Sequence, residues 1–397
     1  MDQTDIFISG AGIAGLAAAA ALATRGFSVT IADPTEPDAA ATAPGADLRS
    51  TAFLQPARAL FEEAGLWDAL APHATPLETL RVIDTAGDPP QARTTRDFEA
   101  ADISDAPFGW NLPNWLTRKV LAEDLATMPG VDLRLGTGFA RILTREREAR
   151  VTLSDGTRLA ARLAVAADGR ASPLRTALGI GVDTIRYGQK ALAFAVTHDV
   201  PHDNVSTELY HRGGAFVLVP LPDHGGKPAS AVVWMHDARA ALDIAALPKA
   251  EFDAKATERS TGILGHLSRI DGLAFWPVVT QTAKALTAER AAILAEAAHV
   301  LPPIGAQGLN TSLNDVRSLL AAIEAHPGDP GAVPVLAAFE RARARDIYAR
   351  ASVIDLYNRI CRSGEAPVQA LRSAGLKLVH DIRPIRRAVM SAGLGDA

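Results

Sequence analysis

The N-terminal segment alternates between short apolar runs and breaks rich in glycine or polar residues. Residues 5–9 form an apolar run that predicts a short buried strand, and an alanine-rich stretch to about Thr24 predicts a helix. Residues 28–32 predict a second strand, which ends at Asp33 before Pro34. Strand, helix and strand in this order are typical of the first unit of an α/β domain with a parallel sheet.

The turn between the first strand and the helix has the pattern G-x-G-x-x-G. Gly10 permits the tight turn, Gly12 leaves space for a pyrophosphate, and Gly15 lets the helix approach the strand. The helix N-terminus stabilises the anion, and Asp33 stands eighteen residues beyond Gly15, where it can accept hydrogen bonds from a ribose diol. This context predicts a dinucleotide site but leaves FAD and NAD both open.

The middle of the chain has a different pattern. Turn residues separate five apolar or alternating runs that predict a mostly antiparallel sheet: residues 191–197, 206–210, 215–219, 229–235 and 275–280. Residues 80–97, bent at 87–90, predict a hairpin of the same layer, and residues 248–268 predict a helical insertion. Gly136-Thr137-Gly138 lacks a third glycine, so we interpret it as a loop. From Val333 onward the periodicity is helical.

Composition narrows the class of protein. The chain has 397 residues, enough for two or three domains at roughly 150 residues each. Hydrophobic residues make up 48% and charged residues 21%, which excludes wholesale disorder. A formal charge of −5 argues against a general nucleic-acid binder. The single cysteine, Cys361, excludes an internal disulfide and a cysteine metal cluster, and it favours a reducing compartment.

The apolar stretch from Ile6 to Ala23 superficially resembles a signal peptide. Asp2 and Asp5 stand where such a peptide has cationic residues, and glycines interrupt the run. No run of eighteen apolar residues occurs elsewhere. We therefore expect a cytoplasmic protein.

Three further segments bear on the choice of cofactor, and two of them repeat the pattern of a strand followed by an acidic residue. Leu163–Arg175 is an apolar strand ending in Asp168-Gly169, Ala292–Asp315 contains a strand, Glu296 and a glycine-rich approach to a helix, and Asp47–Ala52 precedes Leu60–Trp67. With the N-terminal fingerprint, these segments resemble the single-component flavin-dependent aromatic hydroxylases, and specifically the ubiquinone-biosynthesis hydroxylases. The resemblance covers nearly the whole chain and includes four shorter segments: Phe108–Asn114, Arg118–Leu121, Pro220-Leu221 and Leu371–Leu376.

The resemblance implies an α/β fold. A Rossmann-type FAD-binding domain of the glutathione-reductase type would be interleaved with a mostly antiparallel β-sheet substrate domain and followed by C-terminal helices. We expect the FAD-binding domain in residues 1–78, 113–182 and 284–332, the substrate domain in 79–112 and 183–283, and the helical region in 333–397.

The resemblance also implies the chemistry. FAD would be the cofactor and NADH or NADPH the co-substrate, and a flavin C4a-hydroperoxide would hydroxylate a prenylated phenol, an apolar aromatic small molecule, on the route to ubiquinone. FAD would carry out the transfer of oxygen, while the protein would orient FAD and the substrate and exclude water from the site. No acid–base pair stands out in the sequence, so the catalytic residues stay open.

Individual residues receive roles from the same resemblance. Asp168-Gly169 would bind the pyrophosphates of flavin and NAD(P)H, Glu296 would meet the ribityl chain, and the loop 305–310 would lie along the isoalloxazine. Arg49 and Arg118 would contact the cofactor, since a guanidinium suits phosphate recognition. The complete expected set of cofactor residues is Gly10, Ala11, Gly12, Ala14, Gly15, Asp33, Arg49, Arg118, Asp168, Gly169, Glu296, Pro303, Gly305, Gly308, Leu309 and Asn310.

The chain departs from the family pattern at two places. Ala295-Glu296 stands where most members have Gly-Asp, and Gly305-Ala306-Gln307 stands where most have Ala-Gly-Gln. Glutamate keeps the carboxylate, and Gly305 can supply a positive φ that would strain Ala306. His299 lies near Glu296 but has no second histidine at ligand spacing, so we expect it to have a structural or cofactor-packing role.

The C-terminal region is basic. Between Glu340 and Met390 the chain has eleven lysines and arginines against five acids. This surplus indicates either a solvated helix face or a surface that docks on anionic lipid or on a biosynthetic partner, which would place the protein peripherally at the inner face of a membrane.

Two alternatives to the main function stay open. One keeps an enzyme on the same fold, either a hydroxylase of another aromatic or a prenyl reductase. The other is a non-catalytic FAD-binding scaffold within a biosynthetic complex. Oxidation of NAD(P)H stimulated by a phenol distinguishes an enzyme from the scaffold.

Overall fold

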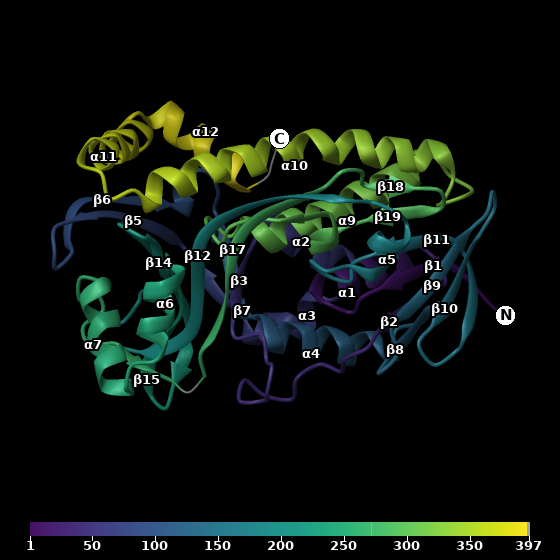
Figure 1. The fold of residues 1–397 in the computed structure, drawn as a ribbon, viewed down its shortest axis with the longest axis horizontal. Helices are drawn as coiled ribbons and strands as arrows, with labels where there is room; N and C mark the ends of the chain where they lie inside the picture. Colours follow the sequence, from purple (N-terminus) through teal and green to yellow (C-terminus); the bar gives the residue numbers. More distant parts are fainter. Residues whose placement is uncertain (271, 395–397) are drawn as a thin grey trace.

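Two large β-sheets and one long helix organise the protein. The structure is a computed structural model that describes residues 1–270 and 272–394. Helix α10 (Val333–Arg362) runs along both halves of the molecule, and it contacts β18 of one sheet and β13, β14 and β17 of the other (Figure 1). The two large sheets are thus held against one common element.

The first sheet has the order β18-β19-β11-β1-β2-β8, with β10 and β9 added antiparallel to β11. The central pairs β19·β11, β11·β1, β1·β2 and β2·β8 are parallel. Its strands are β1 (Asp2–Ser9), β2 (Val29–Asp33), β8 (Val131–Leu135), β9 (Phe139–Thr144), β10 (Ala149–Leu153), β11 (Arg158–Ala166), β18 (Thr287–Ala288) and β19 (Ala291–Ile293). The predicted strands at 5–9 and 28–32 and the predicted loop at 136–138 are confirmed.

Helix α1 (Ile13–Ala23) is almost completely buried because it contains no polar side chain. It contacts β1 and β2 and also α4 (Asn114–Leu125) and α9 (Gln307–Ala325), which come from much later in the chain. The small alanine side chains let several elements approach the helix closely. The remaining helices of this half are α2 (Gln55–Glu63), α3 (Trp67–Leu70), α5 (Pro173–Ala177) and α8 (Ala295–Ala298).

The second sheet has the order β20-β17-β12-β15-β14-β13-β5-β6, with β16 beside β12. All of its pairs are antiparallel except β13·β5, as the alternating runs predicted. Its strands are β5 (Thr79–Ala86), β6 (Gln91–Glu99), β12 (Val182–Thr197), β13 (Val205–His211), β14 (Gly214–His224), β15 (Lys227–Asp237), β16 (Ser268–Arg269), β17 (Ala274–Ala283) and β20 (His299–Val300). The predicted hairpin of residues 80–97 is β5 and β6.

Two helices follow β15 in this half, α6 (Ala238–Ala245) and α7 (Lys249–Arg259). The predicted helix over 248–268 is therefore too long. It ends at Arg259 because Thr261 and Gly262 have φ values of 56° and 66°, in the left-handed region that ends a helix. Of the C-terminal helices, α11 (Ala366–Asp381) lies beside β5 and β6, and α12 (Arg383–Leu394) packs against α11 (Figure 1).

A small third sheet joins the two halves. It contains β3 (Ser50–Leu54), β7 (Gly109–Pro113) and β4 (Thr75–Leu77), and both of its pairs are antiparallel. The chain thus returns through β7 from the second sheet to the half that contains the first sheet, which is called the nucleotide half because it holds the fingerprint turn. The domain boundaries assigned from the sequence stay a prediction, because β20 lies within 284–332 yet pairs with β17 of the second sheet.

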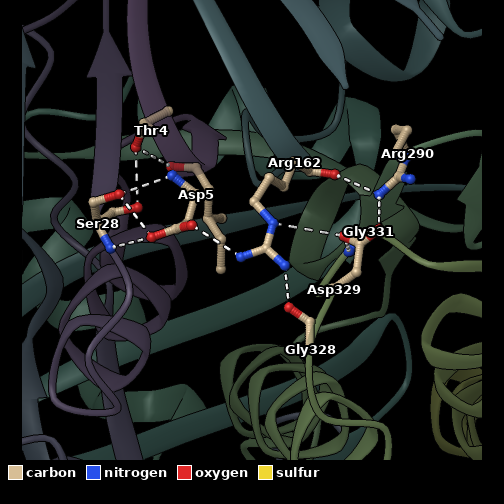
Figure 2. Close-up of polar contacts among 9 residues, drawn as sticks. Thr4, Asp5, Ser28, Arg162, Arg290, Gly328, Asp329 and Gly331 are labelled. Carbon is tan, nitrogen blue, oxygen red and sulfur yellow. Dashed lines mark hydrogen bonds and ion pairs between the residues drawn. The ribbon is translucent and has the colours of Figure 1, made fainter. Parts of the chain in front are cut away.

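A polar network ties the first sheet to the loop between α9 and α10 (Figure 2). The Asp5 carboxylate accepts hydrogen bonds from the Ser28 amide (3.0 Å) and from Arg162 Nη1 (3.1 Å). Arg162 also donates to the Gly328 carbonyl, and Asp329 accepts from Arg290 Nη1 at 2.6 Å. These contacts lie away from the carboxyl ends of the parallel strands, which are the usual place for a ligand in such a sheet.

A buried acid holds the end of the glycine-rich segment. Asp315 on α9 accepts hydrogen bonds from His299 Nε2 (2.7 Å), from the Ala295 amide (2.9 Å) and from Arg343 Nε on α10 (2.8 Å). Burial alone raises the pKa of Asp315, but His299 and Arg343 outweigh burial and hold that pKa below its ordinary value. His299 therefore has the structural role expected from the sequence.

We predict that Asp315→Asn lowers the free energy of unfolding at pH 7 by about 3 kcal/mol, because it leaves a buried Arg343 without its charge partner. The difference in free energy of unfolding between the wild type and Asp315→Asn should be complete above pH 3.8. It should disappear as the pH falls through the depressed pKa of Asp315. Urea unfolding as a function of pH measures both effects. Asp132→Asn, which removes an exposed pair with Arg134, is the control, and an equal loss there would contradict the prediction.

Candidate functional site

One cavity of about 1190 Å³ joins the nucleotide half to the second sheet. Its lining begins at Gly12, passes Arg49 and Glu296, and ends among apolar side chains of the second sheet and of α11 and α12. A volume of roughly 300 to 1,000 Å³ usually suffices for one small molecule. This cavity is therefore large enough for a dinucleotide together with a second ligand.

The three fingerprint glycines have distinct structural duties. Gly10 has a φ of 103°, and a Cβ atom on Gly15 would lie 2.0 Å from the Gly10 carbonyl oxygen. Gly12, by contrast, has no atom within 4 Å of the position that a Cβ would occupy, and it borders the cavity. The fold itself requires Gly10 and Gly15, whereas Gly12 keeps open the space that the pyrophosphate of FAD would take.

Asp33 and Arg118 lie together at this turn. The Asp33 carboxylate accepts a hydrogen bond from the Ala11 amide at 2.8 Å and lies 3.3 Å from Arg118 Nη2. Arg118 Nε donates to the Ala11 carbonyl oxygen at 2.9 Å, and Arg118 also borders the cavity. Both side chains hold the turn in place, and their contacts with the cofactor stay a prediction.

The predicted motif Asp168-Gly169 places only its glycine on the cavity. The Asp168 carboxylate points inward, where it accepts hydrogen bonds from Ser9 Oγ (2.9 Å), from the Leu174 amide (3.1 Å) and from the Ser172 hydroxyl. Burial raises the pKa of Asp168 despite these donors. The carboxylate thus fixes the end of β11 to the start of α5, and Gly169 is the member of the pair that a ligand would meet.

The structure brings Arg49 and Glu296 together, and the contact of each with the cofactor stays a prediction. Arg49 Nη1 lies 3.5 Å from Glu296 Oε1, while Arg49 Nη2 lies 2.6 Å from Asp47 Oδ2. The Arg49 guanidinium also lies 5.3 Å from the centre of the Trp276 ring. All four side chains border the cavity, so an arginine and two acids are available to the phosphate and hydroxyl groups of a nucleotide.

The loop before α9 contributes Pro303 and Gly305 to the cavity, and the first turn of α9 contributes Gly308 and Leu309. The side chain of Asn310 instead makes hydrogen bonds within the protein. It donates to the carbonyl oxygens of Ala52 (2.8 Å) and Ala306 (2.7 Å) and accepts from the Leu54 amide (2.9 Å). Asn310 therefore holds the loop against β3. Both N–H donors of its side chain are therefore used within the protein, and neither is left for the isoalloxazine.

The prediction that Gly305 spares Ala306 a positive φ is wrong. Gly305 and Ala306 have φ values of 62° and 54°, so both residues adopt the left-handed conformation. Ala295, which precedes Glu296, does the same with a φ of 55°. Each alanine costs roughly 1 to 2 kcal/mol in this conformation, and the contacts of Asn310 and Asp315 hold the two segments in it.

Sequence reasoning missed two parts of the cavity wall. Ser206, Glu208 and Tyr210 alternate along β13 with their side chains on the cavity. From the C-terminal helices, Leu376, Val379 and Met390 cover the apolar end of the cavity. The period-two placement of Glu208 within an apolar strand was a signal in the sequence, whereas an amphipathic helix does not reveal which surface it covers.

A dinucleotide fold, an open space at Gly12 and an adjoining apolar chamber are the parts of an FAD-dependent aromatic monooxygenase. The family described as FAD binding domain matches residues 3–350, and the chain belongs to this family and, within it, to the ubiquinone hydroxylases.

Relatives of known name support this assignment. The chain is 32% identical over 395 residues to the ubiquinone hydroxylase UbiL of Rhodospirillum rubrum, covering 98% of this chain and 89% of that one. It is 24% identical to the 3-demethoxyubiquinol 3-hydroxylase of Escherichia coli, covering 99% and 98%. The crystal structure of p-nitrophenol 4-monooxygenase from Pseudomonas putida has the same fold, with a TM-score of 0.79 at 19% identity and 99% coverage of both chains.

We predict that Gly12→Val abolishes FAD binding while the protein still folds, since the added methyl groups enter the cavity and not the core. Gly12→Ala should weaken binding less, because it adds a single methyl group. Flavin absorbance after purification and titration with added FAD measure the effect, and urea unfolding of the FAD-free proteins provides the control. Normal FAD content in Gly12→Val would show that the pyrophosphate lies elsewhere.

Proposed function

We propose that this enzyme hydroxylates a prenylated phenol in the biosynthesis of ubiquinone, using FAD, NAD(P)H and O₂. One observation carries the proposal: a single cavity connects the fingerprint turn at Gly12 with an apolar chamber between β14, β15 and α11. The names of the relatives from Rhodospirillum rubrum and Escherichia coli support the choice of pathway.

Each region of the cavity has a part in this function. FAD, once bound and reduced by NAD(P)H, supplies the oxygen-transfer chemistry. The N-terminus of α1 and Gly12 would receive its pyrophosphate, and Arg49 and Glu296 its polar linker. Val217, Val233 and Leu376 line the apolar chamber, which would hold the ring and the prenyl chain away from water.

The first test is the profile of quinone intermediates in cells that lack the protein. We expect a single prenylated phenol to accumulate, and its missing hydroxyl group identifies the carbon that the enzyme oxidises. In parallel, that phenol should stimulate NAD(P)H oxidation by the purified, FAD-loaded protein. If only phenols without a prenyl chain stimulate NAD(P)H oxidation, the result favours a hydroxylase of another aromatic. If no phenol stimulates it, the result favours the non-catalytic scaffold.

The C-terminal helices are the proposed site of contact with a membrane, because a polyprenylated phenol is too apolar to diffuse freely through water. Among the described residues, no helix is long and apolar enough to cross a membrane. Leu378, Ile382 and Ile385 are exposed on α11, α12 and the link between them, next to the exposed Arg383 and Arg387. An apolar strip flanked by arginines is suited to the surface of an anionic bilayer.

Some arginines of the basic C-terminal region do not belong to the proposed membrane-binding surface. Arg343 is buried against Asp315, Arg372 lies buried against Asp84, and Arg386 Nη2 contacts Asp102 at 3.0 Å. These three arginines attach the helices to the body of the protein. Arg383 and Arg387 are therefore the residues to change in a test of membrane attachment.

We predict that changing both Arg383 and Arg387 to glutamine weakens binding to vesicles of phosphatidylglycerol and phosphatidylethanolamine by about 2 kcal/mol, or roughly thirty-fold. FAD content should not change. The matched control changes Arg141 and Arg158, which are exposed on β9 and β11 of the other half, and it should bind vesicles like the wild type. Equal sedimentation of all three proteins with the vesicles would assign Arg383 and Arg387 to an ordinary solvated face.

A further inference from the structure

Glu208 is a carboxyl group in an otherwise apolar part of the cavity. It lies on β13 with only 7% of its surface exposed, and it borders the cavity together with Val217, Val219 and Val233. No lysine, arginine or histidine in the described residues forms an ion pair with it. A buried carboxylate without a cation is costly, so its position on the cavity wall points to a role towards a ligand.

The groups that face Glu208 are hydrogen-bond donors that carry no charge at neutral pH. Tyr210, also on β13, donates its hydroxyl hydrogen bond to Glu208 Oε2, and the amide of Gly305 acts on the same carboxyl group. From α10, the Tyr357 ring packs edge-on against Tyr210 with ring centres 5.5 Å apart, and Cys361 lies behind them. The carboxyl group is thus held in a fixed place by neutral neighbours.

The location of Glu208 connects the two ends of the cavity. Gly305 belongs to the loop on the nucleotide side, whereas Val219 and Val233 belong to the apolar chamber. An aromatic ring that reacts next to a bound cofactor would have to lie at this junction. Burial raises the pKa of Glu208 even though Tyr210 and Gly305 oppose it, which makes its carboxylate a stronger base than an exposed glutamate.

We propose that Glu208 binds the ring hydroxyl of the phenolic substrate and accepts its proton as the ring is hydroxylated. The inference rests on the proposed function, since it requires a phenol in the chamber. In the step itself, the phenolic O–H bond breaks and an O–H bond forms at the Glu208 carboxylate. The electron pair stays on the phenolic oxygen, which makes the ring more electron-rich and more reactive towards an electrophilic oxygen. Nothing is oxidised or reduced in this proton transfer.

Glu208→Gln in the FAD-loaded protein tests the proposal, because glutamine keeps the shape but cannot accept the proton. With 2-prenylphenol as the substrate, hydroxylation should fall at least a hundred-fold, the usual lower range for loss of a general base. A ring-difluorinated 2-prenylphenol has a more acidic hydroxyl group. With this substrate, the rate of Glu208→Gln should be less than ten-fold below that of the wild type. The deficit should also shrink as the pH rises, because the substrate then loses its proton without help.

Three further variants separate a chemical from a structural role. Glu208→Asp keeps a base and should retain more activity than Glu208→Gln, and Tyr210→Phe should have an intermediate effect. Cys361→Ala changes the same buried cluster without touching the cavity and should behave like the wild type. Binding of 2-prenylphenol, followed by the change in flavin absorbance, should alter less than ten-fold in Glu208→Gln, so that the loss lies in kcat and not in KM.

The outcomes are distinguishable. An equal deficit with both phenols, or no deficit in Glu208→Gln, overturns the role of Glu208 while the proposed function stands. A wild-type protein that hydroxylates neither phenol overturns the proposed function and this inference with it. If Glu208→Gln does not fold or does not retain FAD, the same comparison of the two phenols is made with Glu208→Asp and Tyr210→Phe. A loss of hydroxylation rate that is equal for the two phenols in both of these variants also overturns the proposal.

Discussion

The close approach of α1 to the end of β1 is the constraint on which the rest of this structure depends. The Gly10 carbonyl oxygen occupies the space where a side chain at position 15 would begin, and Gly10 itself adopts a φ open to few other residues. This contact directs the first turn of α1 towards the carboxyl ends of the parallel strands. Gly12 therefore faces the cavity, and Arg118, Asp33 and the later glycine loop are arranged around it.

The second requirement is that segments distant in sequence meet at this turn. Asp315 links α8, α9 and α10, and Asn310 links the glycine loop to β3. The loop is held firmly enough that Ala295 and Ala306 adopt left-handed conformations. The strained backbone beside the cavity indicates that the shape of the site is maintained at a cost in the free energy of folding. Similarly, α11 and α12 are anchored through Arg372 and Arg386, and they close the apolar end of the cavity.

The parts of this arrangement that depend on local pattern could be predicted from the sequence. The fingerprint turn, its flanking strands and the antiparallel sheet follow from periodicity and from glycine spacing. Family resemblance singles out Arg49 and Glu296 but not their contact with each other. Contacts between distant segments could not be predicted in this way. The amino-acid pattern does not reveal that Asp168 points inward, that Glu208 faces Gly305, or that half-buried helices cover a cavity and also reach solvent. The end of α7 at Arg259 cannot be predicted either, because hydrophobic periodicity does not indicate that Thr261 adopts a left-handed conformation.

If the cavity brings a phenol and a reduced flavin together, one oxygen atom of O₂ enters the ring. Mass spectrometry of the product formed in isotopically labelled dioxygen tests this most directly, with the FAD-loaded protein, NAD(P)H and the phenol that accumulates in cells lacking the protein. We expect a hydroxylated product carrying a single labelled oxygen, with no label acquired from labelled water. A product whose new oxygen comes from water, or NAD(P)H consumption that yields only hydrogen peroxide, would contradict it.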